Sequence, residues 1–153
     1  MIEEILSGIS SKIYDTFGDD YEIHSDRIPQ DLNEPCFIIL PLTHTQQSKL
    51  SNSVYKRYYR KYPFNIQFYP KRNGNQYSEN QLVAEKLYEA LEYIETDVGL
   101  LRGSNMRYSI EDKELLSFVV NYNLFVRKDG TDELPKIEEV IYNTEVQKGQ
   151  ADG

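Results

Sequence analysis

The sequence has no tryptophan, a single cysteine and no acidic residue between positions 35 and 78. The lone cysteine, Cys36, excludes an intramolecular disulfide and fits a reducing compartment. No apolar run approaches the roughly 20 residues that a membrane-spanning helix needs. The chain opens with acids, Glu3 and Glu4, whereas a signal peptide opens with bases. We therefore expect a chain of 153 residues to form a protein with no membrane span, no membrane partner and no signal peptide.

Motifs that carry chemistry are also missing. His24, His44 and Cys36 stand singly, without the short spacing of metal ligands. There is no Gly-x-Ser-x-Gly segment and no glycine-rich phosphate loop. Carboxylates are abundant, but they fall on predicted helix exteriors and in the tail. We expect no enzyme, no catalytic residue, no metal and no cofactor, with Cys36 as a small core residue and the histidines on the surface or in strands.

The formal net charge of −8 is unevenly spread along the chain. Residues 1–34 carry −7, residues 35–78 carry +7 and residues 79–153 carry −8. This predicts one basic element on an otherwise acidic molecule. Its seven bases are Lys49, Lys56, Arg57, Arg60, Lys61, Lys71 and Arg72.

Alternation of apolar and polar residues predicts the main strands. Phe64, Ile66 and Phe68 alternate with polar or amphipathic neighbours in a segment bounded by prolines, which indicates a half-buried strand. Residues 116–126 alternate in the same way. Residues 36–40 form a continuous apolar run, typical of a strand covered on both faces. Residues 21–25, 98–102 and 106–110 allow shorter strands.

Two segments have the apolar spacing of amphipathic helices. The first covers residues 2–17 and ends at Gly18, and the second covers residues 79–95 with a capping box from Ser78 to Gln81. Helix, strands, helix and strands in this order predict an α+β fold. We expect an antiparallel sheet of about four main strands, with both helices packed on one face. The domain would span residues 1–127, followed by an acidic C-terminal arm, residues 128–153, flexible or ordered by a partner.

Residues 36–46 and 53–69 are interpreted as one long hairpin whose far end projects from the domain. Three interpretations of this basic end stay open: a contact with the acidic surface of an identical neighbour, head to tail; a solvated hairpin; and a nucleic-acid site in which rings stack on bases. We favour them in that order, because the other two segments carry −15 together and repel a polyanion. The interface residues predicted are Tyr55, Lys56, Arg57, Tyr58, Tyr59, Arg60 and Lys61.

Four segments in order carry a family resemblance. They are Gln30–Ile39 (QDLNEPCFII), Arg60–Pro70 (RKYPFNIQFYP), Leu87–Ile94 (LYEALEYI) and Asp112 ahead of Leu116–Phe118. Over residues 2–127 the sequence resembles the tail terminator, or tail completion, proteins of phages and prophages of Gram-positive bacteria, including headless contractile bacteriocin particles. The expected core and fold-specifying residues are Pro35, Cys36, Phe37, Ile39, Phe64, Ile66, Phe68, Phe118, Val120 and Tyr122.

The resemblance implies a structural protein with no active site. Such a protein forms a ring, expected to be hexameric, that caps the tail tube, stops tube and sheath polymerisation and offers an attachment surface for the head or collar. Its implied partners are other copies of itself, the tail tube protein, the sheath protein where the tail is contractile, and a head connector or collar protein, with nucleic acid only passing through the lumen. The implied location is the head-proximal end of the tail, after assembly in the host cytoplasm. A head–tail adaptor of the same particle is the alternative.

Overall fold

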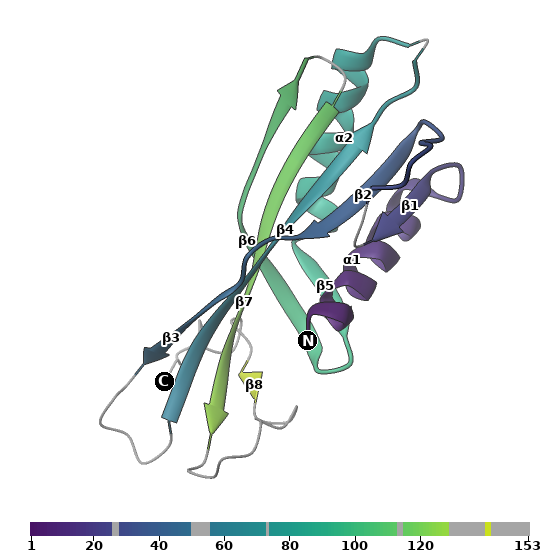
Figure 1. Cartoon of the computed structure of the whole chain (residues 1–153). Coiled ribbons are helices and arrows are strands. Elements are labelled where there is room, and N and C mark those ends of the chain that lie inside the picture. Colours follow the sequence, from purple (N-terminus) through teal and green to yellow (C-terminus); the bar gives the residue numbers. More distant parts are fainter. Residues whose placement is uncertain (26–27, 50–55, 73, 113–114, 129–139, 142–153) are drawn as a thin grey trace.

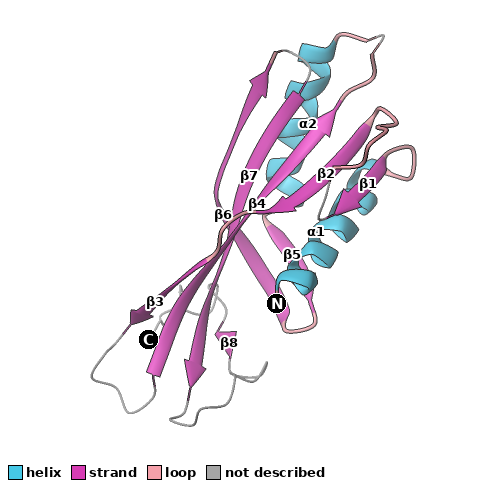
Figure 2. Ribbon diagram, viewed as in Figure 1, coloured by secondary structure: helices cyan, strands magenta, loops and turns pink. Residues whose placement is uncertain are grey.

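The computed structural model describes residues 1–25, 28–49, 56–72, 74–112, 115–128 and 140–141. Two helices form one layer on a long, strongly twisted sheet (Figures 1 and 2). The helices are α1 (Ile2–Phe17) and α2 (Gln76–Ala90). The strands are β1 (Glu22–Ser25), β2 (Cys36–Pro41), β3 (Thr45–Lys49), β4 (Lys56–Tyr69), β5 (Tyr93–Thr96), β6 (Gly99–Glu111), β7 (Leu115–Lys128) and β8 (Val140–Ile141).

The sheet is larger than predicted, and it is mixed. Its main path is β1-β2-β4-β7-β6-β5, while β3 pairs with β4 and β8 pairs with β7. Strand β1 runs parallel to β2, and the other pairs are antiparallel. The α+β class with two helices is therefore confirmed. The prediction of about four antiparallel strands is wrong, because the described residues form eight strands and one pair is parallel.

The helix termini show which local signals decide where a helix begins and ends. Helix α1 has the predicted bounds, and Gly18 follows it with φ 87°, a conformation that favours glycine. The capping box predicted for α2 is wrong, because Asn75 caps this helix by accepting a hydrogen bond from the Ser78 amide at 3.2 Å. Helix α2 also ends at Ala90 rather than at residue 95, since Tyr93–Thr96 pairs with β6 as β5.

The hydrophobic core lies between the helical layer and the inner face of the sheet. Strand β4 contributes Phe64, Ile66 and Phe68, which are fully buried in one cluster with apolar residues of both helices. Of the other expected core residues, Phe37, Ile39, Phe118, Val120 and Tyr122 lie in the same cluster. Neither helix described here is long and apolar enough to cross a membrane.

The outer side of β2 is also buried. Cys36 and Ile38 are inaccessible to solvent without belonging to the main cluster, and Pro35, just before them, is half-buried.

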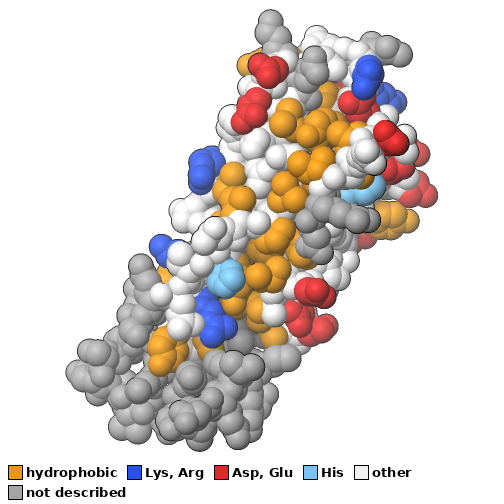
Figure 3. Space-filling view, in the orientation of Figure 1, with side chains coloured by type: hydrophobic (Ala, Val, Ile, Leu, Met, Phe, Trp, Pro, Cys, Tyr) orange, Lys and Arg blue, Asp and Glu red, His pale blue; other side chains and the backbone are white. Residues whose placement is uncertain are grey.

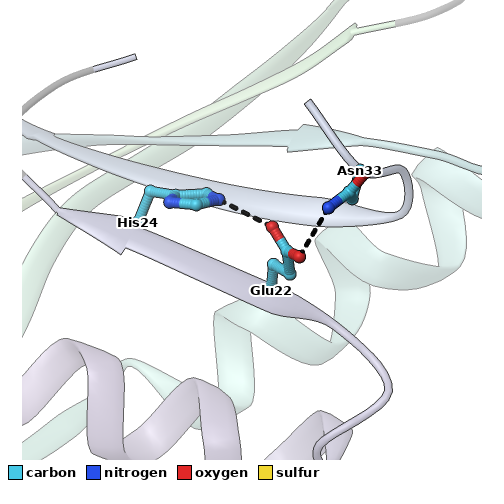
Figure 4. A network of polar contacts seen from close by, with 3 residues as sticks. All are labelled: Glu22, His24 and Asn33. Carbon is cyan, nitrogen blue, oxygen red and sulfur yellow. Dashed lines mark hydrogen bonds and ion pairs between the residues drawn. The ribbon is translucent and has the colours of Figure 1, made fainter. Parts of the chain in front are cut away.

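Asn33, in the connector before β2, donates a hydrogen bond to Glu22 of β1 at 2.8 Å. The other carboxylate oxygen of Glu22 lies 3.0 Å from His24 Nε2 (Figure 4). These two contacts tie the connector to β1 and lower the pKa of the Glu22 carboxyl, with the Asn33 bond as the larger cause.

Candidate functional site

The part of the sheet that extends past the helical layer is the candidate functional site (Figure 1). It consists of β3, Lys56–Lys61 of β4 and Asn123–Lys128 of β7, and we call it the arm. The predicted hairpin accounts for two of these strands. The third strand, β7, pairs with β4 along nearly its whole length, from Lys56 opposite Lys128 to Phe68 opposite Leu116. The arm is therefore an extension of three strands rather than a hairpin, and β8 pairs with its edge at Phe125 and Val126 of β7.

Strands β2 and β3 share one side of β4, and a short interruption separates them. Strand β2 pairs with residues 64–69 of β4, and β3 pairs with residues 57–61. Between them the Leu42 amide donates to the Pro63 carbonyl at 2.9 Å. Pro63 thus marks the boundary between the part of β4 that lies in the core and the part that belongs to the arm.

Aromatic side chains of the arm pack against other side chains of the same chain. The Tyr59 ring lies 4.8 Å from the Phe125 ring on the adjacent strand, and Lys61 Nζ lies 5.8 Å from the Tyr59 ring centre. Tyr62, at the base of the arm, is buried and stacks on His44 with 5.4 Å between ring centres. Both of these tyrosine rings already have intramolecular partners, which disfavours their stacking on nucleic-acid bases.

The structure places the predicted interface residues as follows. Tyr55 lies outside the described residues, and Lys56–Lys61 form the arm part of β4. Tyr58, Tyr59, Arg60 and Lys61 are half-buried, and Arg60 Nε donates a hydrogen bond to Gln46 Oε1 across the strand pair. Whether these residues contact a partner stays a prediction.

Lys49 belongs to the predicted basic element but not to the predicted interface residues, and sequence reasoning missed two further basic residues of the arm, Arg127 and Lys128. Lys49 lies opposite Arg57 on one side of β4, and Arg127 lies opposite Arg57 on the other side. Arg127 was assigned to the end of the domain and Lys128 to the start of the C-terminal segment 128–153, because no local pattern links position 127 to position 57. Only the register of β4 and β7 brings them together.

Charge segregation along the sequence becomes charge segregation in space. Strands β2, β3, β4 and β7 contain no aspartate or glutamate, whereas both helices carry several. In Figure 3, acidic side chains lie at the upper end and along the right-hand edge of the visible face, and an apolar band runs along its middle. The centre of the sheet and the arm therefore form an acid-free surface beside acidic helices.

The hollows on the described body of the protein include two open ones with charged linings. One, of about 430 Å³, is lined by α1 and the β5–β6 turn, through Glu3, Glu4, Ser7, Glu95, Thr96 and Asp97. The N-terminal ammonium group lies 2.9 Å from Glu4 Oε1, and this hydrogen bond lowers the pKa of the Glu4 carboxyl. The other, of about 460 Å³, is lined by Glu34, Tyr69, Pro70, Arg72, Gln76, Glu111, Asp112 and Leu115.

The residues that could support catalysis or metal binding do not converge. Burial raises the pKa of the Cys36 thiol to about 11, so this cysteine is a weak nucleophile at neutral pH. Among the described residues, no group of three or more His, Cys, Asp or Glu side chains is placed to hold a metal ion. What the described arrangement offers is binding through the acid-free arm.

An α+β fold with an acid-free arm beside acidic helices is typical of a subunit that binds other macromolecules. Residues 4–133 match the family model described as phage tail terminator protein, and the chain belongs to this family. The protein is thus a structural component of a phage tail that takes part in virion assembly, which confirms the family resemblance seen in the sequence. A comparison with curated proteins finds no match. The Gram-positive host and the bacteriocin-like particle stay predictions.

Proposed function

We propose that this chain forms a ring, expected to be hexameric, that caps the tail tube at its head-proximal end. The ring stops polymerisation of the tube, and of the sheath where the tail is contractile, and offers an attachment surface to the head or collar. It acts by binding alone, with no catalytic step. The observation that carries this proposal is the family match over residues 4–133, which covers α1 from its third residue, α2, the seven strands up to β7 and all of the arm.

Two features of the structure support assembly through protein contacts. The arm extends past the helical layer, where it can reach a neighbouring subunit (Figure 1). The acidic helices and the acid-free arm give the two sides of a heterologous contact opposite charge, and a repeated heterologous contact closes into a ring. Direct nucleic-acid binding by the arm has less support, because Tyr59 and Tyr62 pack within the chain.

The test combines the oligomeric state of the purified chain with a tube-assembly assay. Light scattering and negative-stain images are expected to show closed rings, and adding the chain to polymerising tail tube protein is expected to stop growth and leave a ring at one end of each tube. An unrelated acidic protein at the same concentration serves as the control. A chain that stays monomeric and leaves tube growth unchanged would contradict the proposal. Rings that bind a head connector but not tube ends would favour the adaptor alternative.

A further inference from the structure

Strand β6 forms an open edge in the upper half of the sheet. Its first residues, Gly99–Arg102, pair with β5, whereas Arg107–Glu111 pair with β7 on one side and with no described strand on the other. The register with β7 is regular over Arg107–Glu111, because the irregularity of β6 lies before this segment. Figure 1 shows the segment at the upper left-hand edge of the sheet. A regular row of backbone N–H and C=O groups at an edge is a template for another strand.

Strand β1 is an edge on the opposite side of the same sheet, since it pairs with β2 and with no other described strand. The two edges lie level, because register rows run across the sheet from β1 through β2, β4 and β7 to β6. One row consists of Ser25, Ile39, Ile66, Phe118 and Tyr108, and another of Ile23, Phe37, Phe68, Leu116 and Ile110.

The directions of the two edge strands also match. Strand β1 is parallel to β2, and three antiparallel pairings separate β2 from β6, so β1 and β6 run in opposite directions. Two copies placed side by side in the same orientation therefore bring the β6 edge of one copy against the β1 edge of the next, level and antiparallel. An antiparallel ladder can form between such edges without any change in either strand.

The side chains of the two edges are complementary on both faces of the sheet. On the face away from the helices, β6 carries Arg107, which is exposed and takes part in none of the ion pairs found among the described side chains. On the same face β1 carries Glu22, whose side chain is 46% exposed. A closed sheet offsets neighbouring strands, and an offset of two or four residues keeps the faces matched and brings Arg107 within reach of Glu22.

On the helical face, both edges carry apolar side chains that are only partly buried. They are Ile23 of β1 and Tyr108 and Ile110 of β6. The inward-facing residues of the strands between them, in the same register rows, are fully buried. Joining the two edges therefore buries further apolar surface on one face and adds an opposite-charge pair on the other.

We propose that the Arg107–Glu111 edge of β6 is a docking surface whose occupant is the Glu22–Ser25 edge of β1 in a second copy of this chain. The sheet then continues from one copy to the next. This inference rests on the proposed ring and names a contact between its subunits. The occupant is a second copy because the level position, the opposite direction and the complementary side chains all belong to one chain. The contact is heterologous, so its repetition can close a ring.

Charge exchange tests the side-chain part of the contact. Arg107→Glu and Glu22→Arg are each expected to weaken ring formation in light scattering at least about tenfold, because like charges then meet at every contact. The protein with both changes is expected to regain rings. Lys71→Glu and Glu85→Arg reverse exposed charges elsewhere and are expected to form rings like the unchanged chain. Thermal melts check that each variant folds, since Glu22 also accepts a hydrogen bond from Asn33.

Hydrogen exchange tests the backbone part of the contact. Along an antiparallel strand, alternate residues direct their N–H groups to the same side. About half of the amides in Arg107–Glu111 and in Glu22–Ser25 are therefore expected to exchange at least about tenfold more slowly in rings than in single copies obtained by dilution. Amides inside α2 (Gln76–Ala90) are the internal control and are expected to exchange alike in both states.

The outcomes separate this inference from the proposed function. Rings that form equally well in both single variants, or whose two edges exchange as fast as in single copies, would overturn the inference and leave the terminator ring standing. Slow exchange at both edges in open filaments would keep the contact and reject the ring. Slow exchange that begins only when tail tube protein is added would overturn the second copy as occupant. Single copies alone, with both edges exchanging fast, would contradict both proposals.

Discussion

The Tyr122 hydroxyl donates a hydrogen bond to the Leu91 carbonyl at 2.8 Å, and both residues are fully buried. Tyr122 lies on the central strand β7, and Leu91 caps the C-terminus of α2. This bond satisfies one of the carbonyls that a helix end leaves without an intrahelical partner. It also fixes the point at which the chain leaves α2 and enters β5, and so it couples the two layers.

The substitution Tyr122→Phe is expected to lower the free energy of unfolding by about 1–3 kcal/mol. The aromatic ring stays in place, but the buried Leu91 carbonyl loses its hydrogen-bond donor. Urea denaturation at neutral pH measures the change. Tyr14→Phe is the control, since Tyr14 is 53% exposed and its loss of a hydroxyl is expected to have little effect. Equal unfolding midpoints for the unchanged chain and Tyr122→Phe would contradict the role given to this bond.

The same residue predicts how stability depends on pH. Burial raises the pKa of the Tyr122 hydroxyl above its ordinary value of about 10. The folded chain keeps this proton where the unfolded chain releases it, so the stabilising effect is complete below about pH 10 and is lost as pH rises further. Denaturation midpoints measured from pH 8 to pH 11 are expected to fall less steeply in Tyr122→Phe. Burial also raises the pKa of Cys36, but that contribution is common to both proteins.

Gly8 is expected to resist a substitution that normally stabilises helices. Alanine in a helix interior is favoured over glycine by about 1 kcal/mol. At Gly8, however, the new Cβ would lie 2.9 Å from the Glu95 carbonyl oxygen and 3.2 Å from Ile94 Cδ1. The backbone of β5 cannot yield cheaply, so Gly8→Ala is expected to destabilise the fold by about 1–3 kcal/mol. Ser11→Ala, on the exposed side of the same helix, is the control, and a gain in stability for both variants would contradict this packing.

Elements that bury one complete face could be predicted from the sequence. Helix α1 and the alternating segments of β4 and β7 place their apolar residues in the core, so periodicity alone locates them. The family resemblance used the segments of β4 and β7, together with Gln30–Ile39 and Leu87–Ile94.

Elements that depend on distant partners could not be predicted. Strand β6 was interpreted as two short strands, because an irregularity between Ser104 and Arg107 breaks its alternation, with Asn105 at φ 51°. Strand β3 is polar, so its sequence lacks the apolar alternation that predicts a strand. Its strand conformation depends on pairing with β4. The register that places Arg57 opposite Arg127 could not be predicted either, because no local pattern links residues so far apart in the chain.

Two buried asparagines give a final prediction in which matched changes have opposite signs. Asn80 of α2 is fully buried, and neither its Oδ1 nor its Nδ2 has a hydrogen-bond partner within the described part of the chain. Asn65 of β4 is also buried, but its Nδ2 donates to Ser117 Oγ at 2.8 Å and to the Phe118 carbonyl at 3.3 Å. A buried polar group without a partner costs about 1–3 kcal/mol, whereas a bonded one stabilises.

We therefore expect Asn80→Leu to raise the free energy of unfolding by about 1–3 kcal/mol, because an apolar side chain of similar size removes the unpaired amide. Asn65→Leu is expected to lower it, because Ser117 and the Phe118 carbonyl lose a donor. Both changes are measured by urea denaturation at the same chain concentration, since ring formation would otherwise shift the midpoints. If Asn80→Leu destabilises the fold as much as Asn65→Leu does, the Asn80 amide has a partner in solution. In that case its burial contributes to stability, and the cost assigned here to the unpaired amide is wrong.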